Sequence, residues 1–505
     1  MILVVDFGSQ TAHLIGRRLR QFGVTARYCN PNDVLSAIEE GKPKGIILSG
    51  GPASVYEDGA PTVPKIIFEF GIPILGICYG WQLTAWLLGG KVENTTKEYG
   101  PETVTLTNAT SIFVLPKKEF TVIVSHGDSV TTLPSGFTVA GSSKTVVNSA
   151  VADLKRNIFG VQFHPEADHT EYGMELLKNF ATRACKEVYK PLMLSPSKII
   201  NVIKETVKDA KVVCAVSGGV DSTVMVYMVQ KAVGKNCIPV YVDSGLMRPN
   251  TKLRLENIFP NIVNADLIII EAKNRFLESL VSVIEPEEKR KTIGKLYIDI
   301  FREAADKYNS VKFLAQGTIY SDVIESKGSM HASKIKSHHN VGGLPKDIPL
   351  TLLEPLRRLY KDEVRTLAKL VGLPEEIINE HPFPGPGYAV RIRGEVTGKR
   401  LEQETIADRI VIEEMKQAGL YDKLFQCFPV MTGAYSTAVK GDGRVFAEVV
   451  AIRAYESRDI MTSKWAHVPY EVLEKISSRI VNEVPDVSRV VYDITTKPPA
   501  TMEWE

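Results

Sequence analysis

A serine- and glycine-rich turn between an apolar strand and a helix is the first stretch of the sequence that could do chemistry. A strand is expected at Val212–Val216, an apolar, valine-rich run typical of a buried parallel sheet. Ser217-Gly218-Gly219 ends this run, and a helix capped by Asp221 or Ser222 is expected to follow. Such a turn attracts anions, because the helix dipole and unpaired backbone N–H groups point towards it. The stretch therefore predicts a phosphate site.

This turn differs from the phosphate-binding loop of kinases. No stretch of the chain matches the pattern GxxxxGK[ST], in which a lysine contacts the transferring phosphate. An ordinary structural turn is the alternative, since short glycine motifs recur by chance. The motif SGGVDS resembles the pyrophosphate-binding PP-loop of the N-type ATP pyrophosphatases, which attack the α-phosphate of ATP. The resemblance implies Mg²⁺ at Asp221 and contacts to ATP from Ser217, Gly218, Gly219, Val220, Asp221, Ser222 and Thr223.

A cysteine occupies a second strand-to-helix turn. The segment Gly76–Gly80, GICYG, has the G-x-nucleophile-x-G pattern, in which a sharp turn holds a reactive side chain clear of the sheet. A helix N-terminus activates thiols in general and supplies N–H groups for an oxyanion. The alternative is a buried cysteine without chemistry. We give that interpretation to the other cysteines, which are Cys29, Cys185, Cys214, Cys237 and Cys427.

A catalytic cysteine needs a base, and the sequence offers one after the expected strand Ile158–Phe163. His164 and Glu166 follow this strand two residues apart, so they lie on one side and the carboxylate can orient the imidazole. An isolated HxE on the surface is the alternative. GICYGWQ, GVQFHPE and Ser49–Pro52 together resemble the class I, triad-type glutamine amidotransferases over residues 1–188.

The resemblance to amidotransferases implies a role for each residue. Cys78 would attack the side-chain amide of glutamine, His164 would move the proton, and Glu166 would orient the imidazole. Ile2 follows Met1, which excludes the amidotransferase type whose nucleophile is an N-terminal cysteine. The implied contacts to the oxyanion and to glutamine are the N–H groups of Gly51 and Tyr79, the side chain of Gln82, and the loop Ser125–Asp128.

Composition bounds the class of protein. A chain of 505 residues with 44% hydrophobic and 24% charged residues is typical of a globular protein, with domains of about 150 residues each. The net charge of +2 gives no general attraction to nucleic acid or to anionic membranes. No apolar run approaches the roughly 20 residues of a membrane span. The sequence contains no CxxC pair, so its six cysteines suit reduced thiols better than disulfides or a zinc site. We therefore expect a cytoplasmic protein without nucleic-acid or membrane partners.

Alternating strands and helices predict an α/β protein with three domains. Strands near residues 1–6, 24–29 and 45–48, with helices near 10–21 and 33–40 between them, indicate a parallel sheet. KPLMLSPS is typical of a linker, and HPFPGPG of a stiff junction. The expected domains are a class I amidotransferase at 1–188, a doubly wound PP-loop ATP pyrophosphatase at 189–380, and an α+β dimerisation domain at 381–505.

The last domain should begin with a strand at Tyr388–Ile392 and end on a docked tail. Two neighbouring prolines and Trp504 argue against a frayed C-terminus. In this tail Lys497 could meet a phosphate, and Glu503 could accept hydrogen bonds from a purine. Upstream, the segment Lys327–Lys346 is either disordered or a lysine-bearing lid over phosphates.

The order of the motifs along the chain points to one family of full-length proteins. SGGVDST, GTIYSDVIES, KSHHNVGG, HPFPGPG, GDGR and KPPATMEWE, behind a triad amidotransferase, closely resemble the glutamine-hydrolysing GMP synthetase family over essentially the whole chain. The resemblance implies that ATP adenylylates the 2-oxygen of XMP and that ammonia then displaces AMP to give GMP. It also implies Mg²⁺, a homodimer formed through the last domain, and XMP contacts at Arg248, Lys497 and Glu503.

Two alternatives remain at this level. A PP-loop transferase of sulfur or nitrogen acting on tRNA would be expected to carry a basic face or paired cysteines, and neither is visible in the sequence. A regulatory pseudoenzyme is disfavoured because the residues that chemistry needs are all present, namely Cys78, His164, Glu166, Ser217, Asp221 and Ser222.

Overall fold

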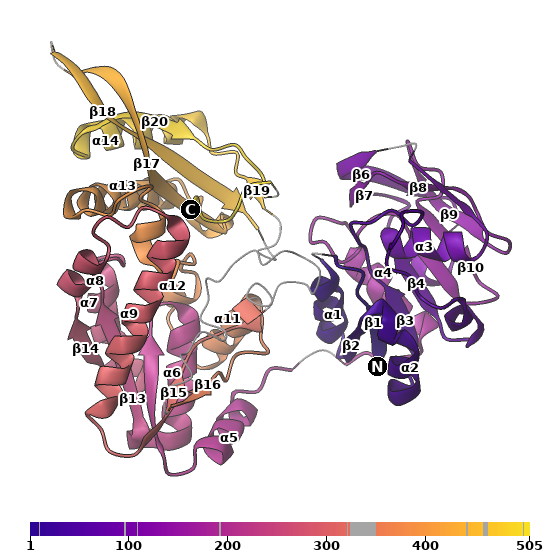
Figure 1. Cartoon of the computed structure of the whole chain (residues 1–505), viewed down its shortest axis with the longest axis horizontal. Coiled ribbons are helices and arrows are strands. Elements are labelled where there is room, and N and C mark those ends of the chain that lie inside the picture. Colours follow the sequence, from indigo (N-terminus) through magenta and orange to yellow (C-terminus); the bar gives the residue numbers. More distant parts are fainter. Residues whose placement is uncertain are drawn as a thin grey trace. The chain divides into compact units, whose positions relative to one another are not determined.

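The computed structural model places the chain in two compact units. It describes residues 1–9, 11–94, 97–108, 110–190, 193–320, 322–323, 350–440, 443–457, 463–497 and 499–505. The first unit comprises Met1–Met193, and the second unit begins at Leu194 (Figure 1). The expected limits of the three domains stay predictions, and the expected lid at Lys327–Lys346 lies outside the described residues. None of the described helices has the length and apolar character that a membrane span requires.

The first unit is built on a nine-stranded sheet with the strand order β2-β1-β3-β4-β11-β10-β9-β6-β7. The sequence predicts four of its parallel strands, near residues 1–6, 24–29, 45–48 and 158–163, and two of its helices close to their observed bounds. The parallel strands are β1 (Ile2–Val5), β2 (Ala26–Cys29), β3 (Gly45–Leu48), β4 (Ile74–Ile77) and β11 (Ile158–Val161). The helices beside them are α1 (Ala12–Gln21), α2 (Val34–Gly41) and α3 (Tyr79–Leu87).

The register between β4 and β11 decides where the candidate nucleophile and base lie. Ile77, the last residue of β4, pairs with Val161, the last residue of β11, and the two strands run parallel. Cys78 follows one strand by one residue and His164 follows the other by three. Because the carboxyl ends of parallel strands meet at one edge of a sheet, both residues reach the same edge.

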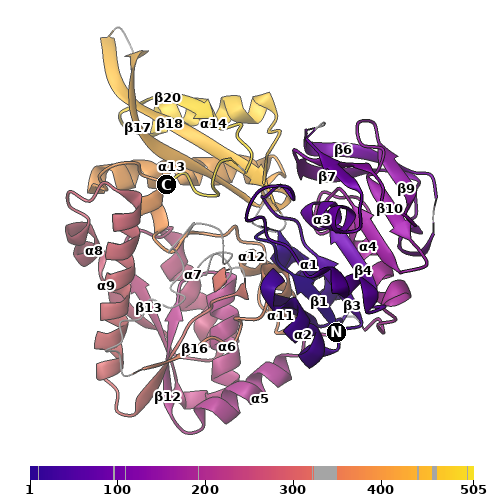
Figure 2. The same cartoon turned by 45° about the vertical axis from the view of Figure 1, so that its right-hand side comes forward.

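The other half of this sheet is antiparallel, and the sequence did not indicate it. Beyond β11 lie the four strands β10 (Ala150–Asp153), β9 (Thr138–Ser143), β6 (Glu98–Leu106) and β7 (Glu119–His126), which Figure 2 shows together on one side of the unit. A small two-stranded sheet, β5 (Lys91–Glu93) with β8 (Ser129–Thr132), accompanies them. The end of β7 delivers the loop Ser125–Asp128.

The second unit contains a five-stranded sheet, entirely parallel, in the order β14-β13-β12-β15-β16. The strand order therefore reverses between β12 and β15, which makes this edge the switch point of a doubly wound sheet. The strands are β12 (Lys211–Val216), β13 (Cys237–Asp243), β14 (Ile268–Glu271), β15 (Val311–Ala315) and β16 (Thr351–Leu353).

Alternate residues of β12 pack on opposite faces of this sheet. Val212 and Cys214 belong to a core with α5 (Pro196–Val207), α6 (Val220–Val233) and α11 (Lys361–Leu370). Val213 belongs to a second core on the other face, which includes α8 (Lys273–Ser279) and α9 (Pro286–Asp306). A sheet covered by helices on both faces matches the expected doubly wound fold.

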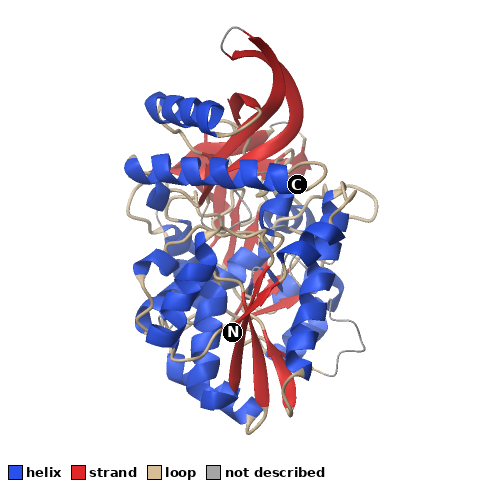
Figure 3. Ribbon diagram, turned by 90° about the vertical axis from the view of Figure 1, so that its left-hand side faces the viewer, coloured by secondary structure: helices blue, strands red, loops and turns tan. Residues whose placement is uncertain are grey.

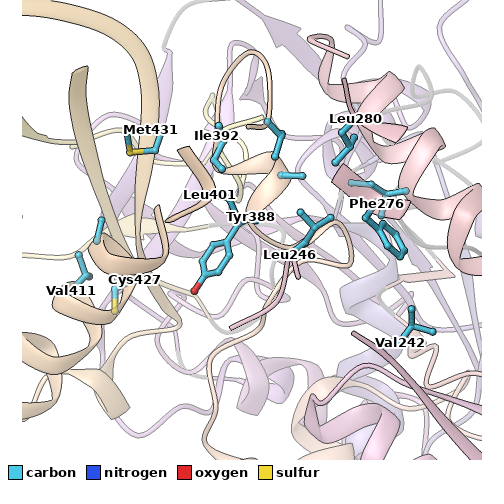
Figure 4. Packing of buried hydrophobic residues seen from close by; sticks show 14 of the residues in the cluster. Val242, Leu246, Phe276, Leu280, Tyr388, Ile392, Leu401, Val411, Cys427 and Met431 are labelled. Atoms are coloured by element: carbon cyan, nitrogen blue, oxygen red, sulfur yellow. The ribbon is translucent and has the colours of Figure 1, made fainter. Parts of the chain in front are cut away.

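The second core continues into the C-terminal part of the chain. Figure 4 shows Phe276 and Leu246 from the parallel-sheet side in one cluster with Tyr388 and Met431. The elements on the C-terminal side are α13 (Gly398–Gln417), β17 (Gln426–Lys440), β18 (Gly443–Glu456), β19 (Lys464–Trp465), α14 (Tyr470–Glu483) and β20 (Val487–Tyr492). Figure 3 shows the paired ends of β17 and β18 projecting beyond the rest of their sheet, and we call these ends, residues 435–440 and 443–448, the arm.

The strand predicted at Tyr388–Ile392 is wrong. Gly387–Val390 forms a short 3-10 helix, and only Ile392 makes a bridge, to Met431. The side chains of this run are buried because the helix packs against both α13 and the turn at Leu246. The N–H of Tyr388 donates to the carbonyl oxygen of Leu246 at 2.8 Å. A uniformly apolar run cannot by itself distinguish these two surroundings.

Candidate active sites

The turn at Cys78 has the shape that its glycines predict. β4 ends at Ile77 and α3 begins at Tyr79, so Cys78 alone makes the turn, with φ 49° and ψ −108°. This conformation is rare for a residue with a side chain and is found where the surroundings enforce it. A Cβ on Gly76 would lie 2.7 Å from the N atom of Trp81, and one on Gly80 would overlap the carbonyl oxygen of Leu48. Both glycines are therefore required for the close approach of α3 to the sheet.

His164, which is partly buried, and Glu166, which is buried, form a pair next to this turn. Nδ1 of His164 lies 2.8 Å from Oε1 of Glu166, and the Glu166 side chain is almost fully buried. Burial opposes the charged imidazole, but the Glu166 carboxylate and a hydrogen bond with the Cys78 side chain outweigh it and hold the pKa of His164 well above its usual range. Burial likewise opposes the carboxylate, yet the charge and hydrogen bond of His164 lower the pKa of Glu166. The structure thus brings the three predicted residues together with a charged His–Glu pair.

The other predicted residues of this site surround the thiol. Gly51 lies against Tyr79, because a Cβ on Gly51 would be 3.4 Å from Cδ1 of Tyr79. Gln82 is buried, and its Nε2 donates to the carbonyl oxygen of Asp128 at 2.7 Å. Gln82 therefore holds the loop Ser125–Asp128, and the carbonyl oxygen of Ser125 in that loop lies 3.8 Å from Sγ of Cys78. A direct contact from Gln82 to glutamine stays a prediction.

Three residues at this centre escaped the sequence analysis. Thr11 donates from Oγ1 to Oε1 of Glu166 at 2.7 Å, and Arg18 donates from Nε to the Glu166 carbonyl oxygen at 3.1 Å. Nε2 of Gln162 lies 3.7 Å from Sγ of Cys78. Gln162 lies within the motif GVQFHPE, although no role was predicted for it. Thr11, the N-cap residue of α1, and Arg18 within α1 lie some 150 positions earlier and carry no local signal.

Two of the other cysteines, Cys29 and Cys427, have raised pKa values. Burial, with a smaller contribution from the Asp33 carboxylate, raises the pKa of Cys29 to about 11. Burial raises the pKa of Cys427 to about 12. A thiol with such a pKa is protonated at neutral pH and is a poor nucleophile.

The loop Ser217–Thr223 lies at the switch point of the second sheet. It joins the carboxyl end of β12 to the start of α6, whose N-cap residue Gly219 supplies no side-chain cap. Gly218 has a φ of 92°, and a Cβ there would overlap Cγ2 of Thr251. Oγ of Ser222 accepts from the N–H of Ser217 at 3.2 Å and donates to the Gly219 carbonyl oxygen at 3.0 Å. These bonds fix the loop around an uncapped helix N-terminus, which is an anion-binding geometry.

Asp221 has one engaged and one open carboxylate oxygen. Its Oδ2 lies 2.6 Å from Nζ of Lys361, at the start of α11. Its Oδ1 is buried and has no hydrogen-bond partner in the described part of the chain. No group of three or more potential ligands occurs among the described residues. A Mg²⁺ ion is commonly held by one or two carboxylates together with substrate phosphates, so the site fits an ion that arrives with a nucleotide.

Two of the predicted XMP contacts belong to one buried network. Arg248 donates from Nε and Nη2 to the Asp408 carboxylate at 2.7 and 3.2 Å. Arg391 bridges Asp408, at 3.4 Å, and Glu503, at 3.2 Å. Burial disfavours the charged forms, but the two arginines hold the pKa of Asp408 below its usual value. Lys497, the third predicted contact, is anchored by two backbone hydrogen bonds of 3.0 Å to Ser463.

The C-terminus is docked, as expected, but polar contacts hold it, and Trp504 itself is exposed. Arg453 is buried and donates to the carbonyl oxygens of Thr501 and Met502 at 2.7 and 3.2 Å. Lys289, also buried, donates to a side-chain oxygen of Glu505 at 2.6 Å. These bonds hold the tail that bears Glu503 against the network of Arg391.

The sheet of the first unit and its cysteine–histidine–glutamate centre define an amidotransferase. Residues 3–184 match the family model described as glutamine amidotransferase class-I. Residues 413–504 match the model described as GMP synthase C terminal domain.

Full-length relatives identify the family. The chain is 47% identical to the GMP synthase [glutamine-hydrolyzing] of Brachyspira hyodysenteriae, with 100% of this chain and 99% of the relative covered. The proteins of the same name from Thermosipho africanus and Campylobacter lari are 47% and 48% identical, again with 100% of this chain and 99% of each relative covered. The chain belongs to the family of glutamine-hydrolysing GMP synthases.

Proposed function

We propose that this protein makes GMP from XMP, ATP and glutamine, with glutamine hydrolysis in the first unit and adenylylation of XMP in the second. The observation that carries the proposal is the presence, in one chain, of the Cys78–His164–Glu166 centre and of an anion-binding loop at the switch point of a doubly wound sheet. The first supplies ammonia, and the second activates the oxygen that ammonia replaces.

In the amidotransferase unit, Cys78 attacks the side-chain amide carbon of glutamine. His164, which carries the thiol proton as an imidazolium, transfers it to the leaving nitrogen, so that ammonia departs and a thioester remains, which water then hydrolyses. Glu166, 2.8 Å from Nδ1, keeps the imidazole oriented and stabilises its charged form. The backbone N–H groups of Gly51 and Tyr79 are the proposed donors to the oxyanion, and their neighbouring positions support this role.

In the second unit, the loop Ser217–Thr223 would bind the phosphates of ATP. The 2-oxygen of XMP attacks the α-phosphate, pyrophosphate leaves, and ammonia displaces AMP from the adenylylated intermediate. Asp221 is the residue that would hold Mg²⁺, through the oxygen that no described residue engages. When bound, the ion supplies positive charge that offsets the charge of the phosphates.

We propose Arg248, Lys497 and Glu503 as contacts to XMP. Because Asp408 occupies the Nε and Nη2 edge of Arg248, the guanidinium is held in one orientation and its remaining N–H groups can meet an anion or a carbonyl. Glu503 accepts from Arg391 and, at 2.9 Å, from Gln426, so its carboxylate is fixed as well. A fixed carboxylate suits recognition of the N–H edge of a purine.

The proposed assembly is a homodimer formed through the last part of the chain. The arm exposes Tyr435, Val439 and Phe446, and the rings of Tyr435 and Phe446 stack at 5.6 Å. Exposed apolar side chains on a projecting hairpin favour association.

The six cysteines are all free, which suits the reducing cytoplasm in which we place the protein.

Pyrophosphate release is the measurement that tests the proposed reaction. With Mg²⁺, ATP and glutamine present, XMP is expected to trigger stoichiometric release of pyrophosphate and formation of GMP. Deamido-NAD in place of XMP tests the amide-forming alternative, and a tRNA substrate with a sulfur donor tests the sulfur-transferring one. Turnover with either alternative but not with XMP would refute the proposed substrate.

A further inference from the structure

Thr11 contacts the glutamate of the amidotransferase centre from a distant part of the chain. Its Oγ1 donates to Oε1 of Glu166 at 2.7 Å, across 155 positions of sequence. Ser9 lies beside it, with the two hydroxyl oxygens 2.9 Å apart. The contact is partly buried and belongs to the same oxygen that faces His164.

The hydroxyl of Thr11 does not serve the helix that it begins. Thr11 is the N-cap residue of α1, where a threonine ordinarily accepts a hydrogen bond from a backbone N–H of the first turn. No such side-chain cap is formed, and the φ and ψ angles of −102° and −2° are not those of a typical N-cap. The hydroxyl is directed to Glu166 instead, so local helix capping does not explain its position.

Glu166 depends on few donors. Oε1 accepts from Nδ1 of His164 and from Thr11, whereas the buried Oε2 has no hydrogen-bond partner among the residues that the structure describes. Burial raises the pKa of Glu166, and the opposing contributions that lower it come from His164 and then from Thr11. Loss of the threonine hydroxyl would leave a buried carboxylate with one side-chain donor.

We propose that Thr11 is a positioning residue of the glutamine-hydrolysing centre, whose hydroxyl fixes the carboxylate of Glu166 so that it orients His164. The inference rests on the proposed function, since it takes Cys78, His164 and Glu166 as that centre. It assigns no contact with glutamine to Thr11.

Several other charged groups face this pair. Arg18 of α1 donates to the Glu166 backbone and pairs with Asp168 two residues further on. His126, at the end of β7, lies near enough for its charge to interact with that of His164, and it pairs with Glu98 at 2.9 Å. Thr11→Val leaves all of these groups in place, so a change in pH dependence would report on Glu166 and His164.

The test compares Thr11→Val and Thr11→Ser with the unchanged protein in a glutaminase assay across pH. Thr11→Val is expected to lower kcat about tenfold with little change in KM for glutamine, the loss typical of a hydrogen bond to a charged group. Without this donor the pKa of Glu166 rises, so the acidic limb of the pH–rate profile should move to higher pH by about one unit or less. Thr11→Ser keeps the hydroxyl and should restore both values.

Two controls separate the possible explanations. Thr182→Val is the matched substitution, because the Thr182 hydroxyl donates to the Lys178 carbonyl oxygen, four positions earlier in the chain, at 2.8 Å. The pH–rate profile of this variant should equal that of the unchanged protein. If Thr11 were merely a helix cap, Thr11→Val would lower the melting temperature and leave the pH profile unmoved, which would overturn the inference. An unaltered kcat in Thr11→Val, with Glu166→Gln impaired, would overturn it as well. Full glutaminase activity in Cys78→Ala would instead refute the proposed centre on which the inference rests.

Discussion

The turns at Cys78 and at Ser217–Thr223 occupy the same place in their sheets but present different groups. Each joins the carboxyl end of a parallel strand to the start of a helix. In the first, strained backbone presents one side chain, and the charges around it neutralise each other in the His164–Glu166 pair. In the second, the hydroxyl of Ser222 ties the loop together, and Asp221 keeps a buried oxygen unpartnered among the described residues.

The difference shows how one local geometry serves two kinds of chemistry. The proposed nucleophile Cys78 must be held next to its base, and the charges of His164 and Glu166 are already paired with each other within the protein. The second turn is the proposed phosphate loop, which would receive its counter-charge from outside, and there Asp221 has a carboxylate oxygen that no described residue engages. Substitutions at the first turn should therefore abolish the glutamine-dependent activity, and substitutions at the second turn should reduce pyrophosphate release.

The largest effect is expected for Cys78→Ala. Removal of the nucleophile should abolish glutamine-dependent GMP synthesis, a loss of at least about 10³-fold, because the thioester cannot form. Synthesis with ammonium in place of glutamine should persist at the rate of the unchanged protein. Loss of both activities in a variant with a normal circular dichroism spectrum would contradict the separation of the two turns.

Asp221→Asn is expected to produce the converse pattern. The amide keeps the shape but not the charge, so the bond to Lys361 weakens and the proposed Mg²⁺ contact is lost. Pyrophosphate release should fall about 10²-fold with ammonium or glutamine as donor, since a metal contributes several kcal/mol of charge stabilisation. Basal glutaminase activity should be unchanged. A variant that releases pyrophosphate normally would show that Asp221 does not act on the nucleotide.

Substitution of two neighbouring glycines in the second turn, Gly218 and Gly219, tests how far backbone conformation and steric overlap limit the residue type at each position. Gly218→Ala combines a positive φ with overlap at Thr251, and should lower the free energy of unfolding by about 1–3 kcal/mol. Gly219→Ala has φ −81° and no atom nearer to the new Cβ than Oγ of Ser217 at 3.8 Å, so its stability should change by less than about 0.5 kcal/mol. Urea unfolding measures both. Equal stabilities would mean that Gly218 is not held in the observed conformation.

The smallest effect concerns His381, a buried histidine of the second unit that contrasts with His164. Burial, with the charges of Arg248, Arg365 and Arg391, lowers the pKa of His381 to about 4. The unfolded chain binds a proton near pH 6.5, whereas the folded chain stays neutral there, so stability should fall as pH drops from about 6.5 towards 4. The loss should not exceed about 1.4 kcal/mol per pH unit.

Urea unfolding at pH 7 and pH 5 measures this loss, and His381→Gln should reduce its slope. A stability that rises between pH 7 and pH 5 in the unchanged protein, but not in the variant, would contradict a neutral His381.

Short-range patterns made much of both centres predictable. The glycines around Cys78, the two-residue spacing of His164 and Glu166, and the serine–glycine turn after β12 are local, and each depends on backbone geometry that a few residues specify. Strands β1, β2 and β3 were predictable for the same reason, because an apolar run bounded by turn residues marks a buried parallel strand.

Features that depend on contacts between distant segments were not predictable. The antiparallel half of the first sheet rests on pairings such as Val104 with Phe120 that alternate weakly in the sequence. The strand predicted at Tyr388–Ile392 is a 3-10 helix, since the packing of Leu246 and α13 decides its conformation. Asp408 gave no signal at all, although it binds Arg248 and Arg391 in one buried cluster.

The sequence by itself determined which groups could react and at which kind of turn each would stand. Only the tertiary structure decided which distant residues contact these groups. Thr11 bonds to Glu166, and Lys361 pairs with Asp221. A chain of contacts also links Arg248 to Glu503. The physical reason is the range of the forces involved. Backbone conformation at a turn follows from neighbouring residues, whereas the charge state and orientation of a buried side chain follow from whatever the fold packs against it.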